Sequence, residues 1–196
     1  MPTGVALRDP RQQLFDAAAR VLLRDGATGL TSRAVTDEAG VAKGVLHRHF
    51  ADFDGFLTEL VLDRITRVDA QATALRGAAG SGTVAGNLTA ALVTLFEPVM
   101  VAIVALVIAR DELRARLRRA GTARLPLVGE GTAMIAGYLT AERDLGRIAP
   151  DADVDTLAPT LIGAAHLLFT DREGSPPETE AVRKLVTTVL ASAARS

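Results

Sequence analysis

Apolar residues recur at helical spacing along almost the whole chain, and this periodicity constrains the fold more than any other feature. Near the start of the chain, one such set stands at i, i+3, i+4, i+7 and i+8, and consists of Leu14, Ala17, Ala18, Val21 and Leu22. The alternation of apolar and polar residues that marks a half-buried strand is hard to find. The sequence therefore predicts an all-α protein.

Glycine and capping residues divide this pattern into about nine helices. Thr31 and Asp52 are suited to cap the helices that follow them, and Gly26 and Gly40 to end the helices that precede them. Residues 77–82 form the clearest linker-like stretch. Beyond a first helix that ends near Gly26, we expect helices at Ser32–Ala39, about Lys43–His49, from Asp52 to about Arg76, and at about Thr83–Phe96, Pro98–Ala120, Leu127–Leu145, Asp153–Asp171 and Glu178–Ala194.

Composition and hydropathy favour a globular, cytoplasmic protein. Hydrophobic residues make up 48% of the chain and charged residues 23%, and there is no cysteine to form a disulfide or a thiolate ligand. The longest apolar run, residues 99–109, is shorter than the roughly 18 residues that a membrane span requires. Residues 1–10 contain no apolar signal core. We therefore expect no membrane partner.

No motif in the sequence points to an enzyme, a metal site or a cofactor. We find no phosphate-binding loop, no paired-histidine zinc motif and no serine-nucleophile elbow. His47 and His49 stand two positions apart, so they would point to different sides of a helix and make a poor metal pair.

Three aspartates near the end of the chain have the spacing of a calcium loop. They are Asp151, Asp153 and Asp155. Thr156 and Ile162 stand where such a loop needs its glycine and its last glutamate. Helix capping is therefore the better interpretation of these aspartates.

The segment Leu30–Phe50 has the spacing of a helix-turn-helix. Two short helices meet at Gly40, and the apolar residues on their inner side would brace the second helix. The opposite face of the second helix stays free and carries Lys43, Gly44, Val45, His47 and Arg48. By itself, this pattern leaves open both a DNA-reading module and an ordinary helical hairpin.

Residues 11–57 resemble the DNA-binding region of the tetracycline-repressor (TetR) family in order and spacing. The matching elements are Ala17-Ala18, Gly26, Thr31, Ala39-Gly40-Val41, Lys43-Gly44, Leu46 and His49-Phe50. The segments LGRIAPDADVD and IGAAHLLF are similar to the C-terminal part of family members. The resemblance implies a three-helix DNA-binding module at residues 1–56 and a helical bundle for ligand binding and dimerisation at residues 57–196. It also implies a homodimer that binds a palindromic operator, most commonly as a repressor, and is released by a small hydrophobic effector.

Lys43, His47 and the start of the preceding helix would contact phosphates, Gly44 would allow close approach, and Val45 could touch a thymine methyl. The full set of expected DNA contacts is Thr31, Ser32, Arg33, Ala42, Lys43, Gly44, Val45, His47, Arg48 and His49.

Three residues depart from the pattern of the family. Ala42 replaces the usual serine or threonine cap of the reading helix, His47 the usual tyrosine, and Phe53 a frequent lysine. Residues 1–57 also hold seven Arg and Lys against seven Asp and Glu, which predicts modest affinity and a shallow salt dependence. Two alternatives remain open: a ligand-binding protein with weak or lost DNA binding, and a constitutive regulator without an effector.

The resemblance also implies an effector pocket and a dimer interface in the C-terminal part. Candidate pocket residues, mostly apolar with polar handles at two of them, are Phe96, Met100, Val104, Met134, Tyr138, His166 and Phe169. Candidate interface residues, which are small or form an apolar helix face, are Gly163, Ala164, Ala165, Val182, Leu185, Val186 and Val189. Packing in the core of one subunit is the alternative role for both sets.

Overall fold

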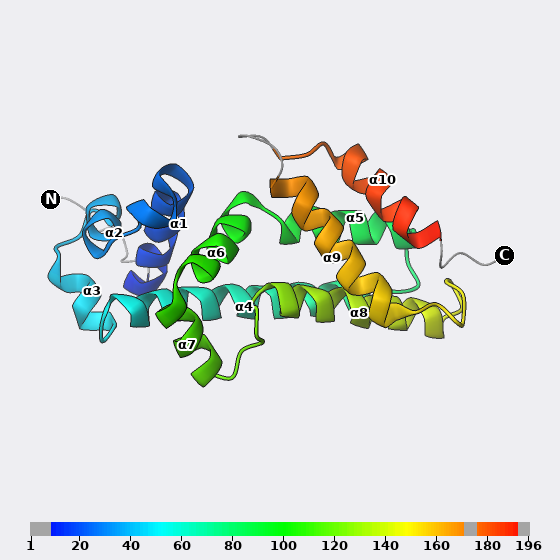
Figure 1. Ribbon diagram of the computed structural model, residues 1–196, viewed down its shortest axis with the longest axis horizontal. Helices are drawn as coiled ribbons and strands as arrows, with labels where there is room; N and C mark the ends of the chain where they lie inside the picture. Colours follow the sequence, from blue (N-terminus) through cyan, green and yellow to red (C-terminus); the bar gives the residue numbers. More distant parts are fainter. Residues whose placement is uncertain (1–8, 171–175, 192–196) are drawn as a thin grey trace, which may run out of the picture.

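The computed structural model describes residues 9–170 and 176–191, and every regular element in these ranges is a helix (Figure 1). The all-α class is therefore confirmed. The helices are α1 (Pro10–Gly29), α2 (Ser32–Ala39), α3 (Gly44–His49), α4 (Phe53–Gly77), α5 (Val84–Leu95), α6 (Pro98–Ala109), α7 (Asp111–Arg119), α8 (Val128–Asp144), α9 (Val154–Thr170) and α10 (Thr179–Leu190). Two expected helix ends, at Asp171 and Ala194, lie outside the described residues.

The long helix α4 joins two groups of helices (Figure 1). At its N-terminal end α4 meets α3 and α1, and α2 packs on α1. α8 packs along α4 farther on, with α5, α9 and α10 beyond. Between the two groups stand α6, which packs against α1, and α7, which packs against α4. The bundle therefore touches the N-terminal module through two short helices.

Local sequence signals set several helix ends, as expected. The Thr31 hydroxyl accepts a hydrogen bond from the Ala34 N–H at 3.1 Å, and the Asp52 carboxylate accepts one from the Gly55 N–H at 2.6 Å. Gly40 ends α2 in the left-handed conformation, with φ 67°.

Aromatic rings hold the N-terminal module to the start of α4. The rings of Phe15 in α1, Phe50 after α3 and Phe56 in α4 have centroids 5.0–5.8 Å apart. All three side chains are buried. This cluster holds the C-terminal end of α3 against the start of α4.

One expected helix boundary was wrong, and at a second, Gly26, the expected break is present but a short helical stretch follows it. The predicted helix Pro98–Ala120 is broken at Arg110, whose backbone is extended with φ −122° and ψ 103°. The Arg110 guanidinium donates a hydrogen bond to the Leu30 carbonyl at 3.2 Å, so a contact far along the chain stabilises the bend. Gly26 interrupts α1 with φ 70° and ψ −174°, but the chain resumes helical geometry and continues to Gly29.

The glycine-rich stretch at residues 77–82 is bound to the bundle. The Arg147 guanidinium donates hydrogen bonds to the carbonyls of Ser81 and Gly82 at 3.3 and 2.5 Å. The same guanidinium lies 3.4 Å from the buried carboxylate of Glu142. These contacts make the stretch a tight corner between α4 and α5.

Within the described residues, no single helix combines the length and the hydropathy needed to cross a membrane. α5 and α6 meet both criteria only when taken together, and the chain bends by 60° between them.

Candidate nucleic-acid interface and ligand cavity

α2 and α3 form a braced helix-turn-helix. In the turn, the Gly40 N–H donates to the Asp37 carbonyl at 3.2 Å and the Val41 N–H to the Thr36 carbonyl at 3.0 Å. Leu46 of α3 is fully buried. α3 is therefore anchored by one side and leaves its other side free.

The free side of α3 carries the residues expected to contact DNA. Thr31, Arg33, Ala42, Lys43, Gly44, His47 and Arg48 are exposed, and Ser32, Val45 and His49 are half-buried. The structure thus brings the ten residues to the start of α2 and the outer side of α3.

Ion pairs neutralise most other cations of the module. Arg20 and Arg24 each lie 2.7 Å from a carboxylate oxygen of Glu38, and their hydrogen bonds lower the pKa of the Glu38 carboxyl. Arg11 pairs with Glu59. By contrast, Lys43 and Arg48 have no ion pair among the described residues. The module is neutral by count, yet its uncompensated cations lie on α3.

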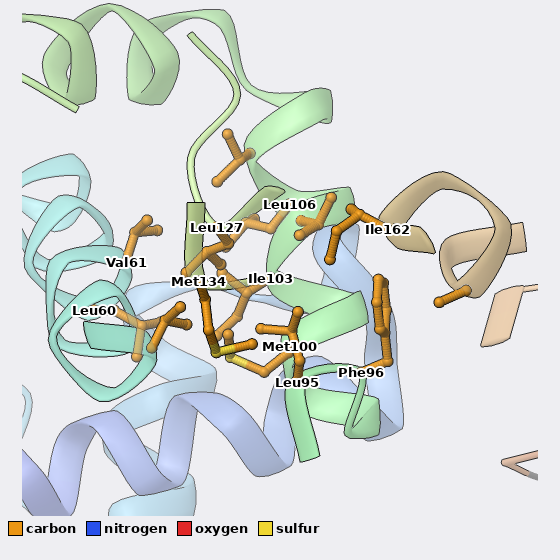
Figure 2. Close-up of a cluster of buried hydrophobic side chains, with 14 of the residues drawn as sticks. Leu60, Val61, Leu95, Phe96, Met100, Ile103, Leu106, Leu127, Met134 and Ile162 are labelled. Atoms are coloured by element: carbon orange, nitrogen blue, oxygen red, sulfur yellow. The ribbon is translucent and has the colours of Figure 1, made fainter. Parts of the chain in front are cut away.

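Four of the seven expected pocket residues line one cavity, and they are Phe96, Met100, Val104 and His166. The cavity has about 310 Å³ of empty space, including its mouth, and lies between α5, α6, α9 and the start of α8. Figure 2 shows Phe96 and Met100 in the apolar cluster around it, together with Leu127 and Ile162. The walls are apolar except at His166.

The other three expected pocket residues lie elsewhere. Met134 lines a second, wider groove of about 590 Å³ between α4 and α5. Tyr138 lines neither space, because its buried hydroxyl donates to Glu142 at 2.5 Å and accepts from the Asn87 amide at 2.9 Å. Phe169 stacks on Phe96, with ring centroids 5.3 Å apart.

The helix-turn-helix region is similar in sequence to a known family of regulators. The sequence model of the family described as bacterial regulatory proteins, tetR family, matches residues 14–60, which hold the helix-turn-helix. The N-terminal module therefore matches the DNA-binding region of the tetR family. No curated protein matches it.

Solved structures of TetR-like regulators share the whole fold. A TetR-family protein from Streptomyces coelicolor is 25% identical with a TM-score of 0.60, over 93% of this chain and 98% of that one. The fatty acid degradation regulator FadR from Bacillus halodurans is 16% identical with a TM-score of 0.72, over 95% and 97%. FadR from Bacillus subtilis, in complex with stearoyl-CoA, is 17% identical with a TM-score of 0.62, over 92% and 95%.

Two departures from the TetR pattern have visible consequences. α3 begins without a side-chain cap, because Ala42 has no hydroxyl and Lys43 makes no capping hydrogen bond. Phe53 stacks on Phe56 with centroids 5.7 Å apart, and the Arg110 guanidinium lies 5.8 Å from its ring centre. Phe53 therefore contacts the bundle through Arg110.

The residues that we expect at a dimer interface divide into two groups by burial. Val182, Val186 and Ala165 are fully buried within the subunit. Ala164, Leu185 and Val189 are half-buried, and Gly163 is exposed. Next to Gly163 on α9, Leu167 is 69% exposed, the most exposed of the large apolar residues described.

Sequence reasoning missed part of the cavity wall. Leu127 lines the cavity and has φ 70°, the one positive φ among the described residues other than glycine. Its N–H donates to the Glu130 carboxylate at 2.6 Å. Glu130, three residues into the expected helix, was the only signal available for this arrangement.

Proposed function

We propose that this chain is a ligand-responsive transcriptional regulator of the TetR family, a repressor that binds a palindromic operator as a homodimer. Residues 1–56 read DNA, and residues 57–196 bind the effector and the second copy. The observation that carries the proposal is the outer face of α3, where Lys43 and Arg48 have no ion pair with any described residue while neighbouring arginines are neutralised. Cations on such a face attract phosphates and position the helix in the major groove.

The arrangement of α6 supports a route from effector to operator. Met100 and Val104 of α6 line the cavity, and Arg110 follows the end of the same helix. Arg110 bonds to the Leu30 carbonyl, directly before the cap of α2. An effector that favours another position of α6 would change the spacing of the two reading helices. A tenfold to hundredfold loss of DNA affinity corresponds to about 1.4–2.8 kcal/mol of coupling.

The likeness to FadR bound to stearoyl-CoA supports a mainly apolar effector for the present chain. The apolar cavity walls support the same class of effector. The regulator would act in the cytoplasm, where the operator is.

Selection of random duplex DNA against the purified protein, followed by a salt titration, tests the proposal. We expect an enriched palindrome with half-sites roughly 34–36 Å apart, and affinity that falls as salt rises. Absence of enrichment at low salt would contradict it.

A second candidate is a TetR-like ligand-binding protein that has lost operator binding. The uncapped start of α3 and the engagement of Phe53 with Arg110 favour it. It predicts ligand binding in the bundle together with no selected DNA sequence.

A further inference from the structure

The cavity between α5, α6, α8 and α9 is lined almost entirely by hydrocarbon. Eight of its nine lining residues are leucine, isoleucine, valine, phenylalanine or methionine, and the ninth is His166. Such walls favour the burial of an apolar ligand, because its surface leaves water without loss of hydrogen bonds. Polar recognition in this cavity therefore rests on one side chain.

That side chain has a polar atom with nothing to bond. Nδ1 of His166 is buried and has no hydrogen-bond partner among the described residues. The imidazole lies beside Phe96, with ring centroids 6.1 Å apart, so apolar groups surround it on that side. A buried polar atom without a partner costs free energy, and a ligand oxygen that reached Nδ1 from the cavity would remove that cost.

Charge near the cavity selects against ionised ligands. No Lys or Arg lines it, and the charged residues within two positions of a lining residue are both acidic, Glu97 and Glu130. The Glu130 carboxylate already accepts the Leu127 N–H. A carboxylate that entered would lose its hydration and meet no arginine or lysine among the lining residues.

One wall of the cavity is strained. Leu127 has φ 70°, which a leucine adopts only at a cost in free energy, and it lines the cavity where α8 begins. Strain of this kind is found at ligand sites. A ligand that displaces Leu127 would let the Leu127 backbone relax. We therefore expect this wall to move when a ligand enters the cavity.

We propose that this cavity binds uncharged, mainly apolar phenols or alcohols, whose single hydroxyl bonds to Nδ1 of His166. A hydroxyl both donates and accepts, so it satisfies Nδ1 whether or not that nitrogen carries the proton. Such a ligand acts as the effector only if the chain is the regulator proposed above, and to that extent the inference rests on the proposed function. Binding of the ligand itself does not depend on DNA.

The test uses three small probes of one shape with the full-length protein. They are 4-ethylphenol, 4-ethyltoluene, which has a methyl group in place of the hydroxyl, and 4-ethylbenzoate. By calorimetric titration we expect the phenol to bind about fivefold more tightly than the hydrocarbon. The benzoate should bind weakest.

Two variants assign the site. His166→Leu should remove the preference for the phenol and keep the affinity for the hydrocarbon, which also shows that the variant is folded. Val104→Phe should fill the cavity and weaken the binding of the phenol and the hydrocarbon alike.

Three results would overturn the inference: no binding of any probe, tightest binding of the benzoate, or a preference for the phenol that survives in His166→Leu. Operator binding is measured separately by DNA selection. If no DNA sequence is selected, the proposed regulator is contradicted, but the probe results still hold. If DNA is selected and the probes fail, only the proposed ligand class is contradicted.

Discussion

The Arg116 guanidinium makes two hydrogen bonds to the Asp52 carboxylate, at 2.8 and 3.0 Å. Asp52 also caps α4, so one side chain both starts the central helix and bonds it to α7 of the bundle. Arg110 makes a similar link, because its guanidinium donates a hydrogen bond to the Leu30 carbonyl just before α2. Through these two arginines, the bundle contacts the backbone that positions the helix-turn-helix.

Asp52 should stabilise the fold in two separable ways. Asp52→Asn keeps a capping oxygen and loses the charge, whereas Asp52→Ala loses both, so we expect the Tm to fall further in the alanine variant. Arg119→Gln, which alters an exposed arginine of α7, is the control and should leave the Tm unchanged. Equal Tm values for the two Asp52 variants would mean that the cap contributes nothing.

The contribution of Asp52 to the stability of the fold should also depend on pH. Hydrogen bonding by Arg116, and then by the Gly55 N–H, lowers the pKa of the Asp52 carboxyl from 3.8. A lowered pKa in the folded state gives stability that is present above the unfolded pKa and is lost as the pH falls through the folded one. Acid unfolding followed by circular dichroism should therefore show a smaller loss of stability below about pH 4 in Arg116→Gln than in the native chain.

Gly40 and Gly44 should respond in opposite ways to alanine. Gly40 has φ 67°, where a Cβ is strained, so Gly40→Ala should lower the free energy of unfolding by about 1 kcal/mol. Gly44 opens α3, and a Cβ there meets nothing within 4 Å. Gly44→Ala should keep stability and weaken operator binding, because the methyl group lies on the proposed DNA face. Chemical denaturation and DNA titration separate the two effects.

Lys43 should contribute a phosphate contact that does not depend on sequence. Lys43→Ala should weaken binding to all duplexes alike and reduce the slope of log affinity against log salt by about 1. Lys184, exposed on α10, is the matched control. An unchanged slope for Lys43→Ala would contradict the phosphate assignment.

Tyr138 should ionise at unusually high pH. Burial, and then its hydrogen bond to Glu142, raises the pKa of Tyr138 to about 12. Because it is the only tyrosine and there is no tryptophan, tyrosinate absorbance reports this residue alone. The stability that comes from the raised pKa is present below the ordinary pKa of 10.0 and is lost as the pH rises toward about 12. A midpoint near 10 in the folded protein would show that the hydroxyl is not held as described.

Leu167 should belong to the interface of the proposed dimer. Leu167→Asp places a charge on the exposed face of α9 and should shift sedimentation toward the monomer. Leu145→Asp is the control, since Leu145 is 57% exposed at the end of α8 and its side chain lies beside Gly80, in the corner between α4 and α5. Equal effects of the two substitutions would place the interface elsewhere.

The sequence by itself determined the helical class, the helix-turn-helix and the caps at Thr31 and Asp52. It also determined the capping role of Asp153, whose carboxylate accepts the Thr156 N–H at 3.1 Å. These features depend on residues within a few positions of one another, so periodicity and capping chemistry show them directly.

The tertiary structure decided those features that depend on contacts between residues far apart in the sequence. The break at Arg110 depends on Leu30, eighty residues away, and the burial of the Tyr138 hydroxyl depends on Asn87. The same holds for the cavity, which includes His166 and Leu127 and leaves out Met134, because its walls come from four helices. Helical spacing gives the face on which a side chain lies, and only packing between helices decides what that face meets.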